Sequence, residues 1–279
     1  MLKSVLRWLR PAAPPASEEI DCRTVGLGDM VKNGWFVNAT GEMAPGFRVG
    51  KDDVLVDVGC GEGGATRFAA RQGAKVIFSD VDADKVAALD AALRESGVMD
   101  ATGLVGDSNP LAIADGVASR VVCSEVLEHV DEPAVVLAEL VRVGKPDAVY
   151  LLTVPDPTGE RLQRRFASAN YFAKPNHIRI FEREQFAALV REAGLEILDV
   201  RFMGAYWTLW MCFYWALERE SGREPEGAIL DRIVPPFHPL LQSWARTWQY
   251  LTEMPEAAPV RRALDEFIPK SQVIIARKP

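Results

Sequence analysis

From residue 52 onward, short apolar runs rich in β-branched residues alternate with amphipathic stretches. The apolar runs predict buried strands at 53–58, 75–79, 101–106, 120–124 and 148–154. Apolar residues at helical spacing predict helices between or after these strands, through Phe68 and over 82–95, 133–142 and 182–193. Such alternation is typical of an open parallel α/β sheet that helices cover on both faces.

Two later runs, 195–203 and 271–277, predict a sixth and a final strand. The segment between them, 204–270, is rich in aromatic residues and proline. A parallel strand at 195–203 would end at the carboxyl edge of the sheet, where open α/β folds bind ligands. We therefore expect a core over 18–203, a lid or substrate insertion over 204–270, and a return to the core at 271–279.

The N-terminal segment, residues 1–17, forms a separate basic arm and linker. Leu2, Val5, Leu6 and Leu9 have helical spacing, whereas the three basic residues lie on the other side, and a Pro-rich stretch follows. Two interpretations stay open: a simple terminal arm, or an interfacial helix that touches anionic lipid at the inner membrane surface. No apolar run is long enough for a secretory signal.

Composition narrows the range of partners. The chain has 279 residues, of which 48% are apolar and 25% charged, as in globular proteins, and its net charge is −7. Without the basic arm the remainder carries a charge of −10, which makes nucleic acid an unfavourable partner. The four cysteines are scattered without a CxxC pair, so neither a disulfide framework nor a cysteine zinc site is indicated, and a cytoplasmic location is expected.

A glycine-rich turn joins the first strand to the first helix, in the sequence DVGCGEGG from Asp57 to Gly64. Glycines let a ligand approach the backbone beside a helix N-terminus, but such a turn alone is weak evidence. Asp80 follows the second strand, where it can accept both hydroxyls of a ribose, and Asp107 follows the third, where it can accept from an adenine amino group. Glu62 within the turn disfavours a phosphate and tolerates a cationic ligand.

These motifs resemble the nucleoside-binding motifs of class I S-adenosylmethionine-dependent methyltransferases. The LVRVGKP segment at 140–146 resembles the RvLkPGG segment of that family, although Asp147 stands where glycine is usual, and 274–279 resembles the family's last, antiparallel strand. The resemblance implies a Rossmann-like, mostly parallel sheet and S-adenosylmethionine as cofactor. It also implies a set of cofactor-binding residues, namely Asp57, Gly59, Gly61, Asp80, Val81, Asp107 and Ser108.

A second group of polar residues, SEVLEHV at 124–130, follows the fourth strand. If this segment opens a helix, Glu125, Glu128 and His129 share one face and form half of a divalent-metal site. His177 in a later loop is the candidate fourth ligand. The alternative is that Glu128 and His129 only brace the helix; His238 is interpreted as an ordinary loop residue.

The ExxEH spacing with a later histidine resembles two groups of metal-dependent O-methyltransferases, those of ubiquinone biosynthesis and those that methylate the 3′-terminal ribose of small RNAs. The resemblance implies that Glu125, Glu128, His129 and His177 bind Mg, Mn, Fe or Zn, which would activate a hydroxyl, for example of a vicinal diol. Without a metal, His129 and His177 are the candidate catalytic bases.

Residues 202–217 carry no charge and include six aromatic side chains between Tyr206 and Trp215, in addition to Phe202 at the start. Three placements are open: burial in a lid or homodimer core, a wall for an apolar substrate, or contact with a membrane interface. Trp244 and Trp248 could join the same cluster. The expected activity is O-methylation of a small or lipid-linked acceptor. The alternatives are metal-free methylation of a small molecule, methylation of an RNA end, and a regulatory module that only binds the cofactor.

Overall fold

The computed structural model describes residues 19–222 and 234–279, so the predicted arm and linker at 1–17 lie outside the described residues. Its main sheet has seven strands in the order β5-β4-β3-β6-β7-β9-β8. The strands are β3 (Val54–Val58), β4 (Lys75–Asp80), β5 (Ala101–Val105), β6 (Ala118–Ser124), β7 (Gly144–Pro155), β8 (Glu196–Met203) and β9 (Ser271–Arg277). β9 pairs antiparallel with β7 and with β8, and the other strands share one direction. The predicted Rossmann-like sheet with an antiparallel last strand is confirmed.

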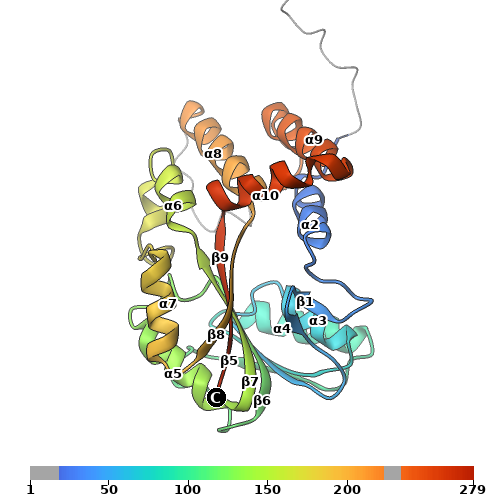
Figure 1. The fold of residues 1–279 in the computed structure, drawn as a ribbon, viewed down its shortest axis with the longest axis vertical. Coiled ribbons are helices and arrows are strands. Elements are labelled where there is room, and N and C mark those ends of the chain that lie inside the picture. The colour runs from blue at the N-terminus through green and yellow to red at the C-terminus, as the bar shows by residue number, and fades with distance from the viewer. Residues whose placement is uncertain (1–18, 223–233) are drawn as a thin grey trace, which may run out of the picture.

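Helices cover both faces of this sheet (Figure 1). On one face α3 (Gly64–Arg71) and α4 (Ala83–Glu95) pack with the small hairpin of β1 (Glu42–Ala44) and β2 (Phe47–Arg48). On the other face α5 (Pro133–Val143) and α7 (Arg183–Glu192) bury their apolar sides against the strands. The amphipathic spacing read from the sequence thus corresponds to two separate apolar cores, one on each side of the sheet.

A helical cap stands over the end of the sheet where the parallel strands finish (Figure 1). We use this name for α2 (Cys22–Lys32), α8 (Ala205–Glu220), α9 (Pro239–Glu253) and α10 (Ala258–Phe267), with the short η3 (Pro255–Ala257) between the last two. Three of these helices come from the predicted insertion. α2 precedes the sheet and lies within 18–203, the part of the chain predicted to form the core. In the structure it packs against α9 of the cap.

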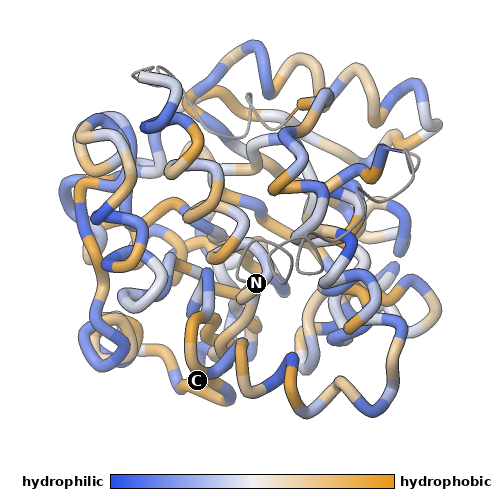
Figure 2. Tube along the Cα trace, turned by 90° about the horizontal axis from the view of Figure 1, so that it is seen from above, coloured by the Kyte–Doolittle hydropathy of each residue, from blue (hydrophilic) through white to orange (hydrophobic). Residues whose placement is uncertain are grey.

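Aromatic side chains fill the interior of the cap. Tyr206, Trp210, Tyr214 and Trp215 of α8 are all buried, which corresponds to the first of the three placements left open by the sequence. Trp248 is also buried, and its neighbour Trp244 stacks on Tyr206, so both tryptophans of α9 join the cluster as expected. Seen from above, apolar and polar stretches alternate along the chain (Figure 2). None of the described helices has the length and apolar character needed to cross a bilayer.

Buried polar groups tie the helices of the cap together. Arg261 of α10 donates to Asp29 of α2 at 2.6 Å, and both side chains are more than nine-tenths buried. Asp265 accepts from the backbone N–H of Ala205 at 2.8 Å, at the start of α8. Burial raises the pKa of Asp265 to about 6, and the negative charge of Asp29 adds to this rise.

The raised pKa of Asp265 makes a prediction about the pH dependence of stability. A carboxyl group whose pKa is higher in the folded state is most favourable for stability below its unfolded pKa, near 4. This contribution to the free energy of unfolding is lost as the pH rises through about 6. Asp265→Asn keeps an acceptor for the Ala205 N–H and cannot ionise. We expect the free energy of unfolding of the wild type, minus that of the variant, to fall by up to about 3 kcal/mol between pH 4 and pH 7.

Urea unfolding at several pH values measures this difference. Asp90→Asn is the matched control, because Asp90 is more exposed and pairs with Arg94 on the surface of α4. A difference for Asp265→Asn that does not change with pH would contradict the assignment.

Candidate functional site

The glycine turn connects β3 to α3 and lies against the ExxEH segment. Gly59 has φ +71°, and a Cβ there would lie 2.3 Å from Cγ2 of Val126, so the two segments approach too closely for a side chain. Gly61 has φ +49°, but a Cβ on it would meet no atom within 4 Å. The backbone at Gly61 therefore faces open space that a ligand can enter.

Two aspartates fix this turn. Asp57 is buried, and one of its oxygens accepts from both the N–H and the hydroxyl of Thr66, at 3.1 and 2.6 Å. These bonds tie the end of β3 to the first turn of α3, and burial raises the pKa of Asp57 to about 6. Asp80, the last residue of β4, accepts from the N–H of Gly61 at 2.9 Å and from that of Asp82 at 3.0 Å. The carboxylate expected to bind a ribose thus lies directly beside the open turn.

The remaining expected nucleoside-binding residues lie at the ends of the neighbouring strands. Val81, which follows β4 directly, is 72% exposed although its side chain is apolar. Asp107, just after β5, is exposed and accepts from the N–H and hydroxyl of Ser108. Because β5, β4 and β3 are adjacent, these residues form one row along the carboxyl edge of the sheet.

The ExxEH segment is not a helix, and the sequence-based expectation on this point is wrong. Glu125 has φ +55°, which is incompatible with a right-handed helix, and its N–H continues the strand pairing by donating to the carbonyl of Thr153. A turn closed by the N–H of His129 and the carbonyl of Val126 follows, and the next helix begins only at Pro133. This turn, rather than a helical face, determines which side chains meet.

Glu128, His129 and His177 meet at the carboxyl edge of the sheet. One ligand atom of each lies within 4.8 Å of those of the other two, and the two imidazole rings have centroids 5.0 Å apart. Glu128 is fully buried, and neither of its carboxylate oxygens has a hydrogen-bond partner among residues 19–222 and 234–279. Burial, together with the negative charge of Glu125, raises the pKa of Glu128 well above its ordinary value. A cation beside this carboxylate would replace the missing interactions.

Hydrogen bonds through Nδ1 fix the orientation of both histidines. The Nδ1 atom of His129 lies 3.1 Å from the carbonyl of Pro175, and Nδ1 of His177 lies 2.9 Å from a carboxylate oxygen of Glu160. Since these oxygens accept, each Nδ1 carries a proton, and Nε2 is the nitrogen that a neutral ring would offer to an ion. Burial lowers the pKa of His129, and the neighbouring His177 lowers it further. The lower pKa favours the neutral ring, which is the form that binds metals. Outer carboxylates and carbonyls commonly orient metal-binding histidines in this way.

Glu160 and Tyr171 belong to the same site and were not identified from the sequence. Glu160 lies in α6 (Pro157–Gln163), and Tyr171 lies in η1 (Ala169–Phe172). The Tyr171 hydroxyl donates to Glu160 at 3.3 Å, and its ring packs on that of His177. Neither residue stands in a recognisable motif, so only the folded chain reveals them.

Glu125, which the resemblance implies as a metal ligand, does not join this group. One of its oxygens accepts from Lys270 at 2.6 Å and the other from the hydroxyl of Thr153 at 3.1 Å. Burial alone would raise the pKa of Glu125, but the charge and hydrogen bond of Lys270 hold it below its ordinary value. Lys270 is a further residue that sequence reasoning missed.

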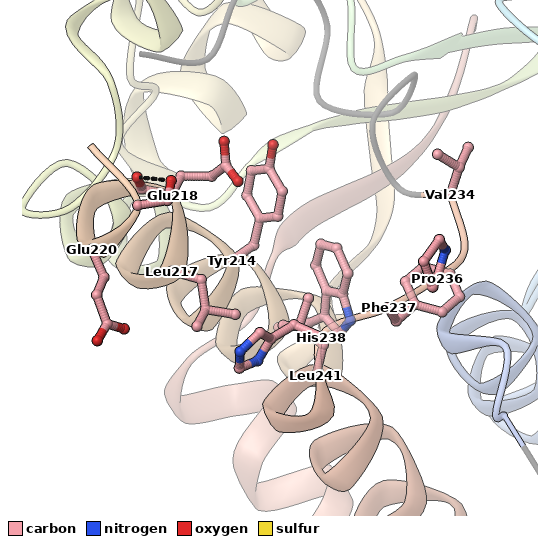
Figure 3. A pocket seen from close by; sticks show the side chains of 11 residues that line it. Tyr214, Leu217, Glu218, Glu220, Val234, Pro236, Phe237, His238 and Leu241 are labelled. Atoms are coloured by element: carbon pink, nitrogen blue, oxygen red, sulfur yellow. Dashed lines mark hydrogen bonds between the residues drawn. The ribbon is translucent and has the colours of Figure 1, made fainter. Parts of the chain in front are cut away.

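A cavity of about 370 Å³ lies in the cap, and its lining includes neither the glycine turn nor His129 or His177 (Figure 3). Its lining comes from α8 and from the segment 234–241, and includes Tyr214, Glu218 and Phe237. His238 also lines it, and its Nδ1 accepts from the N–H of Leu240 at the start of α9. This helix-capping role agrees with the interpretation of His238 as an ordinary loop residue.

The fold and site define the class of protein. The mostly parallel sheet has one antiparallel strand, and the glycine turn and the acidic residues expected to bind a nucleoside lie at its carboxyl edge. Residues 41–200, more than half of the chain, match the family model described as a methyltransferase domain. The chain belongs to this family, within the class I S-adenosylmethionine-dependent methyltransferases, and S-adenosylmethionine is the cofactor of this domain.

Two ubiquinone biosynthesis O-methyltransferases are among the proteins to which this chain is similar. The ubiquinone biosynthesis O-methyltransferase of Xanthomonas euvesicatoria pv. vesicatoria is 29% identical over 53% of this chain and 65% of its own length. That of Burkholderia pseudomallei is 28% identical over 56% of this chain and 68% of its own length. The match to the Xanthomonas enzyme therefore spans just under two thirds of that protein.

A solved structure supports the fold alone. A geranyl diphosphate methyltransferase in complex with S-adenosylmethionine aligns with a TM-score of 0.58 at 15% identity, over 96% of this chain and 93% of its own.

Asp147, which replaces the usual glycine of the family segment, adopts the left-handed φ of +62°, so the turn conformation is compatible with the substitution.

The open backbone at Gly61 makes a prediction about cofactor affinity. A methyl group at this position would occupy the space left for the ligand, so we expect Gly61→Ala to raise the Kd for S-adenosylmethionine at least about tenfold, the equivalent of 1.4 kcal/mol. Gly97→Ala is the matched control, since Gly97 also has positive φ (+80°) and open space around it but lies in the turn after α4. Isothermal titration gives both affinities, and an equal loss for the two variants would contradict the placement of the ligand.

Proposed function

We propose that this chain methylates a hydroxyl oxygen of a small or amphipathic acceptor, with a divalent ion held by Glu128, His129 and His177. In this reaction an oxygen–carbon bond forms while the sulfur–carbon bond of S-adenosylmethionine breaks, and the hydroxyl proton is released. The products are a methyl ether, S-adenosylhomocysteine and a proton. The similarity to O-methyltransferases of ubiquinone biosynthesis supports the choice of oxygen.

The observation that carries the proposal is the buried Glu128 carboxylate. Its two oxygens lack hydrogen-bond partners among the residues that the structure describes, and two imidazoles held through Nδ1 lie beside it. The donor set of one carboxylate and two imidazoles fits a divalent ion. When bound, such an ion lowers the pKa of a coordinated hydroxyl and so makes the acceptor oxygen more nucleophilic.

The chain's own residues would position the reactants. Gly61 and Asp80 would hold the methionine and ribose parts of the cofactor, with Asp107 at the adenine. Gly59 packs against Val126, next to Glu125, and so brings the glycine turn close to the ExxEH turn. The cofactor and the acceptor hydroxyl would then occupy neighbouring positions at the same edge.

The cap is suited to an acceptor with an apolar part. Trp215 of α8 packs on Tyr171, and Tyr171 packs on His177, so buried aromatic rings link the candidate metal-binding residues to the cap. An acceptor with a hydroxyl head and an apolar body could place the head at the histidines and direct the body toward the cap. The acidic body of the chain disfavours an RNA end as acceptor.

Methyl transfer to a panel of catechols, quinols, sugars and lipid-linked diols, with and without chelator, tests this function. We expect Glu128→Gln to reduce kcat/KM by about a hundredfold or more, because it removes the charged ligand, while the Kd for S-adenosylmethionine changes by less than about twofold. Glu192→Gln on the exposed surface of α7 is the matched control.

Several results would decide against parts of the proposal. Undiminished turnover in chelator and in His129→Ala would remove both the ion and this imidazole from the mechanism. Loss of activity in His177→Ala alone, without an effect of chelator, would favour a metal-free imidazole base. Cofactor binding without turnover over the whole panel would favour a regulatory module.

A further inference from the structure

The carboxylates of Glu125, Glu128 and Glu160 lie around the candidate ion position and differ in their partners. Glu160 accepts from Nδ1 of His177 and from the Tyr171 hydroxyl, so it would act on the ion through a histidine. Glu125 accepts from Lys270 and from Thr153. Glu128 has no hydrogen-bond partner within the described part of the chain, and its nearest basic atom is Nε2 of His129 at 3.8 Å. The structure therefore sorts the acids of the site into one candidate ligand and two groups that are already engaged.

The fold places Lys270 beside Glu125. Lys270 immediately precedes β9, and because β9 runs antiparallel, its first residues lie at the edge where the parallel strands end. The Lys270 N–H donates to Met203 at 2.8 Å, and the N–H of Asp156 donates to the Lys270 carbonyl at 2.9 Å. With its backbone fixed between the ends of β7 and β8, the lysine can direct its ammonium group to Glu125.

We propose that Lys270 withdraws Glu125 from the ion, so that the protein ligands are limited to Glu128, His129 and His177. This inference rests on the proposed function, from which it takes the ion. It differs from the four-ligand set that the ExxEH resemblance implies, because the first glutamate is neutralised by a lysine of this chain.

The three-ligand set has consequences for the choice of ion and acceptor. Two imidazoles and one carboxylate suit manganese, iron, cobalt or zinc better than magnesium, which prefers oxygen ligands. Fewer protein ligands also leave more positions open, and two adjacent open positions are what a vicinal diol needs in order to chelate the ion. Lys270 would thus determine both metal preference and access of a bidentate acceptor.

Metal binding in the absence of cofactor and acceptor tests the inference separately from activity. We expect Glu125→Gln to leave the Kd for Mn²⁺ within about twofold of the wild-type value, and Glu128→Gln to raise it at least about tenfold. Isothermal titration with Mn²⁺ and with Mg²⁺ provides the values, and titration with S-adenosylmethionine checks that each variant is folded. Equal losses in the two glutamine variants would overturn the inference.

A double-mutant cycle shows whether Lys270 acts by holding Glu125. We expect Lys270→Met to free this carboxylate and to lower the Kd for Mg²⁺ about fivefold or more, and the double variant Lys270→Met/Glu125→Gln to lose this gain. Lys75→Met, at the exposed opposite end of β4, is the control for loss of a positive charge.

The remaining outcomes are also decisive. A gain in affinity for Mg²⁺ that persists in the double variant would come only from removing the repulsive charge of Lys270. It would contradict the proposal that Lys270 keeps Glu125 from binding the ion. Absence of Mn²⁺ binding to a wild-type protein that still binds S-adenosylmethionine would overturn the inference, while methyl transfer itself would remain measurable with the acceptor panel.

Discussion

Removing a carboxylate from water is costly unless hydrogen bonds or an opposite charge replace its hydration. The acids at the carboxyl edge of this sheet meet that requirement in different ways. Asp57 uses the hydroxyl and N–H of Thr66, and Glu125 uses the ammonium group of Lys270. Glu128 has no such partner within the described ranges although it is fully buried. It must therefore bind a proton, a cation or a ligand, and the two imidazoles beside it give the position the character of a metal site.

The topology of the sheet explains why these groups meet although they are far apart in the sequence. Gly61, Asp80, Asp107 and the ExxEH turn each follow the end of a parallel strand, so the fold collects them at one edge. The antiparallel β9 adds the residue before its start, Lys270, to the same edge. The cap then covers this edge because its insertion leaves the sheet at the end of β8 and returns at the start of β9.

The sheet could be predicted almost entirely from the sequence, because each buried strand is a continuous apolar run and each covering helix has one apolar face. The location of Asp80, Val81 and Asp107 at one edge was predictable for a related reason, since a position at the end of a parallel strand determines a position at the carboxyl edge. The ExxEH segment was more difficult. Glu125 adopts a left-handed φ that residues other than glycine rarely have, so the helix considered from the spacing does not form at this position.

The partners of the candidate ligands depend on tertiary contacts that no local pattern contains. Glu160 lies in a short helix without a motif, and its role follows only from its distance to His177. Lys270 could have been identified by one additional step, namely that the start of an antiparallel last strand lies beside the ends of the parallel ones. Burial of the aromatic segment was one of three placements that the sequence left open, and its contact with Tyr171 could not be predicted.

The same contacts make the cap and the candidate metal site one structural unit. A Cβ on Gly159 would lie 2.6 Å from the carbonyl oxygen of Pro269, so α6, which carries Glu160, lies directly against the chain that leads into Lys270. From the other side, Trp215 of the cap packs on Tyr171, which donates to Glu160. The packing of α8 on Tyr171 therefore links the cap to Glu160, the carboxylate that orients His177. If this site binds an ion as proposed, a change in the position of α8 would also affect the groups around that ion.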